Sequence, residues 1–137
     1  MPESSSLRYK VLLVDDDATV LKSMAAALEF DVDVSTCSSA ERALSMLQGG
    51  QFHVVCSDYS MHGMTGTELL EKVARLPDPV GCLLVTGSSS FVGRAGVGDH
   101  YVLMKPVDPE RLNALILQLA RIAEMKRNSK RQKNPTR

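Results

Sequence analysis

The fold is decided by residues 52–66, which read FHVVCSDYSMHGMTG. An apolar run with the branching of a buried strand ends at one acid, Asp58, and glycines and a helix-start signal follow it. Asp58 is therefore predicted at the carboxyl end of a strand. In open parallel α/β sheets ligands bind at that edge, because the loops that leave the strands form a crevice there. A simpler interpretation is that Asp58 only begins a turn, as Asp often does.

Composition narrows the class of protein. The chain has 137 residues, enough for one domain with its own core, and 44% of them are hydrophobic. No apolar run has the length of a membrane span, and residues 1–6 lack the basic and apolar regions of a signal peptide. We therefore expect a cytoplasmic protein with no membrane partner. The cysteines Cys37, Cys56 and Cys82 have no metal-ligand or redox spacing, and we interpret Cys56 and Cys82 as small buried hydrophobic residues.

Charge is distributed unevenly along the chain. All sixteen acids, but only ten of the sixteen Lys and Arg residues, lie at or before Glu124, so that part carries −6 and residues 125–137 carry +6. This predicts a body at 9–124, preceded by a flexible segment at 1–8 and followed by a basic tail or linker. The tail has no aromatic residue for base stacking and no recognition-helix pattern, so we do not expect nucleic acid as its partner. We favour a solvated helix end or a linker to an output domain outside these residues over a site for acidic lipid or an acidic protein.

Strand-like and helix-like segments alternate from residue 9 onward. Apolar strands are predicted at 9–14, at 32–36, in the run that ends at Asp58, at 80–85 and at 101–104. Helix starts are predicted after the acids 15–17, at a capping box over 38–41, at a second capping box over 65–68, and at Asp108. Residues 88–100 are rich in glycine, so any helix there should be short. The alternation predicts a five-stranded parallel sheet with helices on both faces.

Chemically active residues fall at four of the predicted strand ends. Asp15 and Asp16 follow the first strand, Asp58 the third, Thr86 the fourth and Lys105 the fifth. A cluster of hard carboxylate oxygens suits Mg²⁺, and a hydroxyl and an ammonium can donate to the oxygens of a phosphoryl group. An Asp carboxylate can then act as nucleophile and form an aspartyl phosphate.

In this order and setting the motifs resemble the receiver domain of bacterial two-component response regulators. The matching residues are Asp15-Asp16, Asp58 followed by Met61, Gly63, Met64 and Gly66, then Thr86, then Lys105-Pro106. The resemblance implies a flavodoxin-like, doubly wound sheet of strand order 2-1-3-4-5 and a cis bond before Pro106. Because the segment between Thr86 and Lys105 is short and rich in glycine, we expect the fourth helix of this chain to be short or degenerate.

The same resemblance implies roles for individual residues. Asp58 would be the phosphoacceptor, Asp15, Asp16, Asp58 and the carbonyl of Ser60 would hold Mg²⁺, and Thr86 and Lys105 would contact the phosphoryl group. The implied partners are a histidine kinase or histidine phosphotransfer protein and a downstream effector or output domain, with a second copy of the chain as a further candidate. The protein would be a signalling phosphoacceptor that catalyses its own phosphorylation and dephosphorylation, and not a dedicated metabolic enzyme.

The chain departs from the family pattern at several positions. His62 stands where proline is usual, and we interpret it as a solvated loop residue. Thr65 replaces a common acid, and the segment between Thr86 and Lys105 is short. Val102 occupies the position of the family's switch aromatic, and Tyr101, one place earlier, points to the opposite face of the strand.

Two other functions fit parts of the pattern. Asp15-Asp16-Asp17-Ala18-Thr19 also resembles the nucleophile loop of haloacid-dehalogenase-type phosphatases, with Asp15 as nucleophile and Asp17 as general acid. That interpretation leaves Asp58 without a role and finds no acidic pair after Lys105. The other is a receiver-like interaction module with little dependence on phosphorylation, which the altered region before Lys105 allows.

Overall fold

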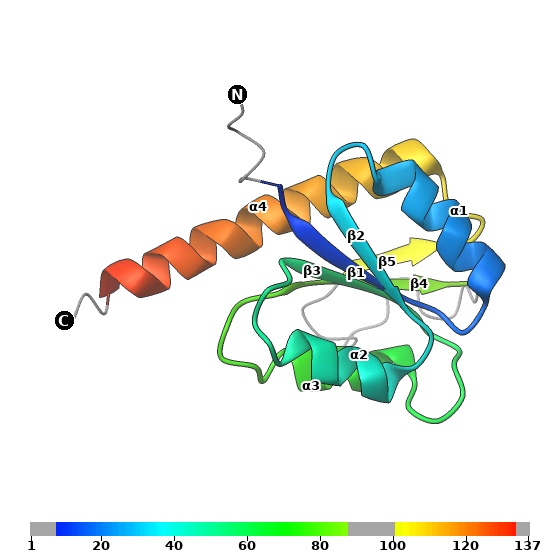
Figure 1. Ribbon diagram of the computed structural model, residues 1–137, viewed down its shortest axis with the longest axis horizontal. Helices are drawn as coiled ribbons and strands as arrows, with labels where there is room; N and C mark the ends of the chain where they lie inside the picture. Colours follow the sequence, from blue (N-terminus) through cyan, green and yellow to red (C-terminus); the bar gives the residue numbers. More distant parts are fainter. Residues whose placement is uncertain (1–7, 88–100, 134–137) are drawn as a thin grey trace.

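The computed structural model describes residues 8–87 and 101–133. Five parallel strands form one sheet of order β2-β1-β3-β4-β5, as predicted (Figure 1). The strands are β1 (Lys10–Val14), β2 (Asp33–Cys37), β3 (Val54–Asp58), β4 (Gly81–Thr86) and β5 (Tyr101–Met104). The bounds of β5 are those predicted, and β1, β2 and β4 begin one residue later than predicted. All four strand ends that carry the predicted site residues therefore lie along one edge of the sheet.

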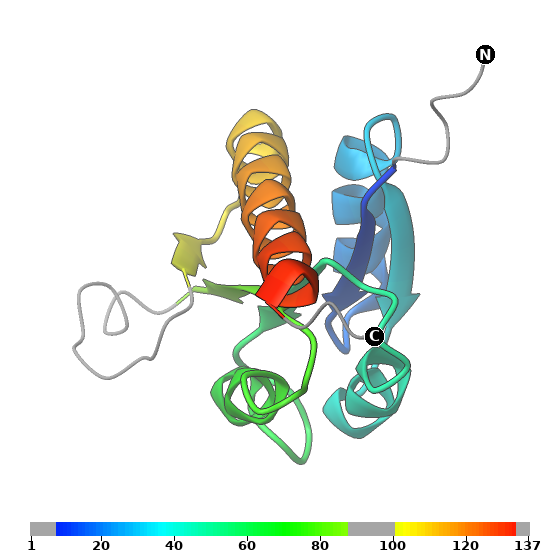
Figure 2. The ribbon, with the colours of Figure 1, turned by 90° about the vertical axis from the view of Figure 1, so that its left-hand side faces the viewer.

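Helices cover both faces of the sheet (Figure 2). The described helices are α1 (Ala18–Leu28), α2 (Ala40–Leu47), α3 (Gly66–Val73) and α4 (Pro109–Lys133). On one face α1 and α4 pack over alternate strand residues such as Leu13 and Leu83. On the other face α2 and α3 pack over the intervening residues, such as Leu12 and Leu84. The period-two alternation of strand side chains thus builds two apolar layers that both hold β1, β3 and β4 in place.

Side-chain caps fix where the helices begin. Thr65 and Glu68 form the predicted capping box at α3. The capping box predicted over 38–41 is wrong, because the cap of α2 is Ser39, whose hydroxyl accepts from the Arg42 amide. The Glu41 carboxylate is turned toward the loop at Gly63 instead of back to the helix start. At α4 the Asp108 carboxylate accepts from the Glu110 amide, as expected for an N-cap.

Helix α4 continues without a break across residue 124, where the sequence predicts the end of the body, and extends past the sheet (Figure 1). The Arg127 guanidinium donates to the carbonyls of Pro79 (3.0 Å), Gly50 (3.3 Å) and Phe52, and the Lys130 ammonium donates to that of Pro77. Part of the predicted tail is therefore helical and bonded to two loops of the body. The division of the chain at residue 124 stays a prediction.

Two sequence predictions concern residues outside the described ranges. They are the short or degenerate helix at 88–100 and most of the flexible segment at 1–8. Within the ranges the structure does describe, none of the helices combines the length and the apolar character that crossing a bilayer requires.

Candidate functional site

Two buried carboxylates lie side by side at the carboxyl edge of the sheet. Asp58 is the last residue of β3 and is 7% exposed, and Asp15, directly after β1, is 4% exposed. Their strands are hydrogen-bonded neighbours, with Val14 paired to Ser57, so the two acids leave the sheet together. The Asp15 amide donates to the Cys37 carbonyl at 3.1 Å, which continues the ladder with β2 one residue beyond the strand. The backbone of the sheet thus places both acids.

A lysine faces these acids from the end of β5. The Lys105 ammonium lies 2.8 Å from Asp58 Oδ1 and 3.7 Å from Asp15 Oδ2. Burial lowers the pKa of Lys105, but the hydrogen bond and charge of Asp58, with the charges of Asp15 and Asp17, outweigh it and raise the pKa. Lys105 is therefore held as a cation against the acids. The peptide bond that follows it, Lys105-Pro106, is cis, as the family resemblance implies.

The surroundings of Asp15 raise the pKa of its carboxyl. Burial raises its pKa, and the charges of Asp58 and Asp16 raise it further, although the Asp17 amide and Lys105 act in the opposite direction. The Asp17 amide donates to Asp15 Oδ1 at 2.9 Å, so the side chain has a fixed orientation. A fixed and partly uncompensated carboxylate is suited to bind a cation.

Asp16 completes a three-carboxylate cluster. One oxygen from each of Asp15, Asp16 and Asp58 can be chosen so that all three lie within 4.8 Å of one another. These are hard oxygen donors on a rigid sheet edge, and one lysine balances only part of their charge. The residues present therefore fit Mg²⁺. Asp17, by contrast, serves as the N-cap of α1, where its carboxylate accepts from the amides of Thr19 and Val20.

Thr86 lies at the end of β4, and Ser60 lies in the loop after β3. Thr86 is 3% exposed, and its carbonyl accepts from the Lys105 amide at 2.9 Å, so it stands between the ends of β3 and β5. Ser60 is exposed, two residues beyond Asp58. The structure thus brings together Asp15, Asp16, Asp58 and Lys105 and places Thr86 at the same edge. The role of the Ser60 carbonyl stays a prediction.

Gly66, the first residue of α3, is required sterically, which the sequence motif alone does not show. A Cβ added to Gly66 would lie 2.3 Å from the Asp58 carbonyl oxygen, so only glycine lets α3 begin this close to the acid. The Gly66 amide donates to the Tyr59 carbonyl, and the Tyr59 amide to that of Val85, both at 2.9 Å. Both ends of the 59–66 loop are therefore tied to the site. Cys56, under the acids, is inert, since burial raises the pKa of its thiol to about 12.

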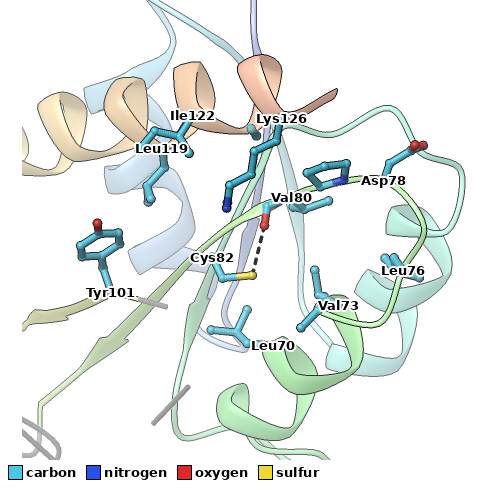
Figure 3. A pocket seen from close by; sticks show the side chains of 14 residues that line it. Leu70, Val73, Leu76, Asp78, Val80, Cys82, Tyr101, Leu119, Ile122 and Lys126 are labelled. Atoms are coloured by element: carbon cyan, nitrogen blue, oxygen red, sulfur yellow. Dashed lines mark hydrogen bonds between the residues drawn. The ribbon is translucent and has the colours of Figure 1, made fainter. Parts of the chain in front are cut away.

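Val102 and Tyr101 face opposite sides of β5, as the sequence predicts. Val102 packs with the α2 and α3 layer, whereas Tyr101 is 48% exposed. Tyr101 lines a hollow of about 320 Å³ between α3, β4 and α4, together with Cys82 and Leu119 (Figure 3). Neither Asp15, Asp16 and Asp58 nor Thr86 and Lys105 line this hollow, so it is separate from the acidic site. An aromatic ring is absent from the position where the family places its switch residue.

His62 makes a contact that the sequence did not predict. Its imidazole Nδ1 lies 3.0 Å from Asp16 Oδ2, although the ring is fully exposed. The two residues are 46 positions apart, and no local pattern in the sequence connects them. The interpretation of His62 as a solvated loop residue is therefore incomplete, because its ring contacts a member of the acidic cluster.

A doubly wound parallel sheet with acids, a threonine and a lysine at its carboxyl edge defines a class of α/β proteins that bind charged ligands at that edge. Residues 11–117 match the family described as the response regulator receiver domain. The chain belongs to this family.

Individual relatives agree with the family match. A response regulator receiver domain from Methanospirillum hungatei JF-1, described as CheY-like, is 31% identical in its crystal structure, with a TM-score of 0.77, covering 87% of this chain and 98% of that one. The two-component response regulator ORR21 of Oryza sativa subsp. japonica is 41% identical over 75% of this chain and 16% of its own length. The transcriptional regulatory protein FixJ of Bradyrhizobium diazoefficiens is 31% identical over 83% of this chain and 58% of its own. The chain thus spans much less than the full length of these two regulators.

Proposed function

We propose that this domain accepts a phosphoryl group on Asp58, with Mg²⁺ bound by Asp15, Asp16, Asp58 and the Ser60 carbonyl, and passes a signal to a partner protein. The observation that carries the proposal is the 2.8 Å contact between Lys105 Nζ and Asp58 Oδ1 beside two further carboxylates. Membership of the receiver family supports it, because the matched region contains all of these residues.

The chemical step needs a nucleophile and donors for the transferred oxygens. An oxygen of Asp58 forms a bond to phosphorus while the bond from phosphorus to a donor imidazole nitrogen breaks, and that nitrogen keeps the electron pair and takes up a proton. Mg²⁺ would supply positive charge to the phosphoryl oxygens. Lys105, already held beside Asp58, and Thr86 would donate hydrogen bonds to the same oxygens. Attack by water on phosphorus would later break the bond to Asp58 and release inorganic phosphate.

The donor in this proposal is a phosphohistidine protein, which would dock beside the site. A hollow of about 390 Å³ lies between α1 and the segment that runs from Lys105 into the first turn of α4, and its lining includes Met24, Lys105 and Leu112. Its wall reaches Lys105, so a donor docked there would stand next to Asp58. A histidine kinase or histidine phosphotransfer protein is the donor that family membership favours.

Introducing an arginine on this proposed docking surface distinguishes phosphoryl transfer from a protein donor from transfer from a small-molecule donor. Ser23 is exposed on α1 at the rim of the hollow, and Ser23→Arg should obstruct a phosphotransfer protein. We expect slower transfer from a phosphorylated phosphotransfer protein and unchanged labelling by acetyl phosphate. Equal slowing with both donors would contradict docking at this surface.

Phosphorylation is tested by intact-mass spectrometry after incubation with acetyl phosphate and Mg²⁺. We expect one phosphoryl adduct on the wild type. Asp15→Asn should give a weaker adduct signal, because Asp15 contributes a metal ligand but not the nucleophile. Asp58→Asn keeps the shape of the side chain and should give no adduct. The adduct should be stable in acid and lost in base, as expected of an acyl phosphate.

Other outcomes favour the other two functions. An adduct that persists in Asp58→Asn but is lost in Asp15→Asn would favour a phosphatase-like nucleophile at Asp15, although Asp17 is already engaged as a helix cap. No adduct on any of the proteins would favour the receiver-like interaction module, for which Val102 at the switch position is the supporting observation.

A further inference from the structure

The contact between His62 and Asp16 joins the two loops that form the mouth of the acidic site. His62 lies in the loop between β3 and α3, and Asp16 lies in the loop between β1 and α1. A carboxylate can only accept, so the imidazole Nδ1 carries the proton and donates to Asp16 Oδ2 over 3.0 Å. The hydrogen bond therefore leaves the other carboxylate oxygen of Asp16 available to a cation.

Asp16 is the least restrained acid of the cluster. Asp15 is buried and accepts from the Asp17 amide, and Asp58 is buried and paired with Lys105. The Asp16 side chain is 33% exposed, and in the described part of the chain no group other than His62 donates to it. Without His62, its carboxylate would be free to turn into solvent.

The loop that carries His62 is itself held at both ends. The Tyr59 and Gly66 amides are bonded to carbonyls at the ends of β4 and β3, as described above. Gly63, directly after His62, has φ of +81°, a backbone conformation that side chains other than glycine rarely adopt. The backbone at His62 is thus positioned by its neighbours, so the imidazole is presented toward the mouth of the site.

We propose that His62 is a positioning residue for the metal site: it holds Asp16 within the carboxylate cluster and thereby raises the affinity for Mg²⁺. Donors to the second oxygen of a metal-ligating carboxylate commonly change metal affinity by about 10- to 100-fold when removed. Because the His62 ring is exposed, we expect an effect below this range, a loss of roughly 3- to 10-fold. This inference rests on the proposed function, since it assumes that Asp16 is a metal ligand.

The test is isothermal titration of the whole chain with MgCl₂ at pH 8, without a phosphodonor. His62→Ala removes the donor and should weaken the Kd for Mg²⁺ by roughly 3- to 10-fold. His62→Asn is the matched variant, because its amide nitrogen lies at the same branch of the side chain as Nδ1, and it should keep most of the wild-type affinity. Thermal melting without Mg²⁺ should be the same for all three proteins, which excludes an effect through folding.

The outcomes separate this inference from the proposed function. Equal affinity for wild type and His62→Ala would overturn the positioning role. Tighter binding by His62→Ala would overturn it too, because His62 would then compete with the cation for Asp16. If either occurs while Asp58 is still labelled in a Mg²⁺-dependent way, the proposed function stands alone. If the wild type binds no Mg²⁺, the proposed metal site and this inference fail together.

Discussion

The two edges of the sheet use charged side chains in opposite ways. At the carboxyl edge three carboxylates converge, and Lys105 is the cation placed against them. At the amino edge Arg127 and Arg8 each lie among several acceptors to which they donate. Arg127 donates to the carbonyls of two loops that lead into β3 and β4. Arg8 donates to three carbonyls in the turn that leads into β2, and to Asp33.

This difference distinguishes charged groups that stabilise the fold, at the amino edge, from charged groups that serve function, at the carboxyl edge. At the amino edge the hydrogen-bonded charges of Arg8 and Arg127 hold the loops that enter the strands. The excess acid at the carboxyl edge should cost folding free energy until a cation binds, as is usual for a functional site within a stable scaffold. Mutations at the two edges should therefore change stability with opposite sign.

The largest effect is expected from Arg127→Ala at the amino edge. It leaves the carbonyls of Gly50, Phe52 and Pro79 without their donor, and these groups are partly buried. We expect a loss of about 2–3 kcal/mol in the free energy of unfolding, measured by urea denaturation. Arg121→Ala, an exposed arginine on the same helix, is the control and should change it by less than about 0.5 kcal/mol. Equal effects of the two substitutions would mean that the hydrogen bonds of Arg127 contribute nothing to stability.

The next largest effect is expected from one chemical change, Asp to Asn, made once at each edge. Asp15→Asn removes a buried charge whose pKa is raised by burial and by Asp58, so in the absence of Mg²⁺ it should stabilise the fold by roughly 0.5–2 kcal/mol. Asp33→Asn at the amino edge breaks a 2.8 Å ion pair with Arg8 and should destabilise by up to about 1 kcal/mol.

Addition of Mg²⁺ sharpens this comparison. Millimolar Mg²⁺ should raise the melting temperature of the wild type and of Asp33→Asn if, as proposed, the ion binds the native state. It should do much less for Asp15→Asn, which lacks one of the proposed ligands. A wild type whose melting temperature ignores Mg²⁺ would contradict the view that the carboxyl edge is destabilised by uncompensated acids.

Much of the carboxyl edge could be predicted from the sequence, because its signals are local. Asp15, Asp58 and Lys105 each follow an apolar run, and alternating strands and helices require parallel strands whose ends share one edge. The strand order came from the family resemblance and not from the pattern itself. The cap of α2 is Ser39 and not the predicted box, and the Glu41 carboxylate lies near Gly63, a residue 22 positions away that a local motif does not include.

The amino edge and the His62 contact could not be predicted in this way. The charge distribution predicts that residues after 124 are basic, but it gives no sign that Arg127 meets carbonyls 48 to 77 positions away. Such contacts depend on how far α4 runs past the sheet and on which of its faces meets the loops. His62 likewise meets Asp16 because two loops from neighbouring strands converge, which local spacing does not encode.

A smaller effect on the free energy of unfolding is expected from a change of pH, through His53 at the amino edge. The Lys10 amide donates to His53 Nδ1 at 3.0 Å, and His53 Nε2 lies 3.3 Å from a Glu124 oxygen. Burial lowers the pKa of His53 below its ordinary value of 6.5, and the charges of Arg127 and Lys10 act in the same direction, against Glu124. The neutral ring, packed edge-on against Tyr9, is therefore the form that the fold prefers.

The sign of the pH dependence follows from the lowered pKa of His53. Its contribution to stability is present above pH 6.5 and is lost as pH falls through the lower pKa of the folded state. Urea unfolding at pH 7.5 and pH 5 should show an additional loss of about 1 kcal/mol at pH 5, the size of one hydrogen bond. His53→Asn keeps an acceptor near Nδ1 but does not titrate, so this part of the pH dependence should disappear. A pH dependence identical to that of the wild type would contradict the assignment.

The smallest effect concerns Lys130, which donates to the Pro77 carbonyl from an exposed position one turn beyond Arg127. Lys130→Ala should cost less than about 0.5 kcal/mol, because a long exposed side chain gains little from one solvated contact. Its value is in a double-mutant cycle with Arg127→Ala. If Arg127 is what holds the end of α4 against the loops, Lys130→Ala should have no effect once Arg127 is gone, because its partner is then out of reach. Additive losses in the free energy of unfolding would instead mean that the two side chains bind the loops independently. The amino edge would then be held by separate contacts, and Lys130 would not depend on Arg127.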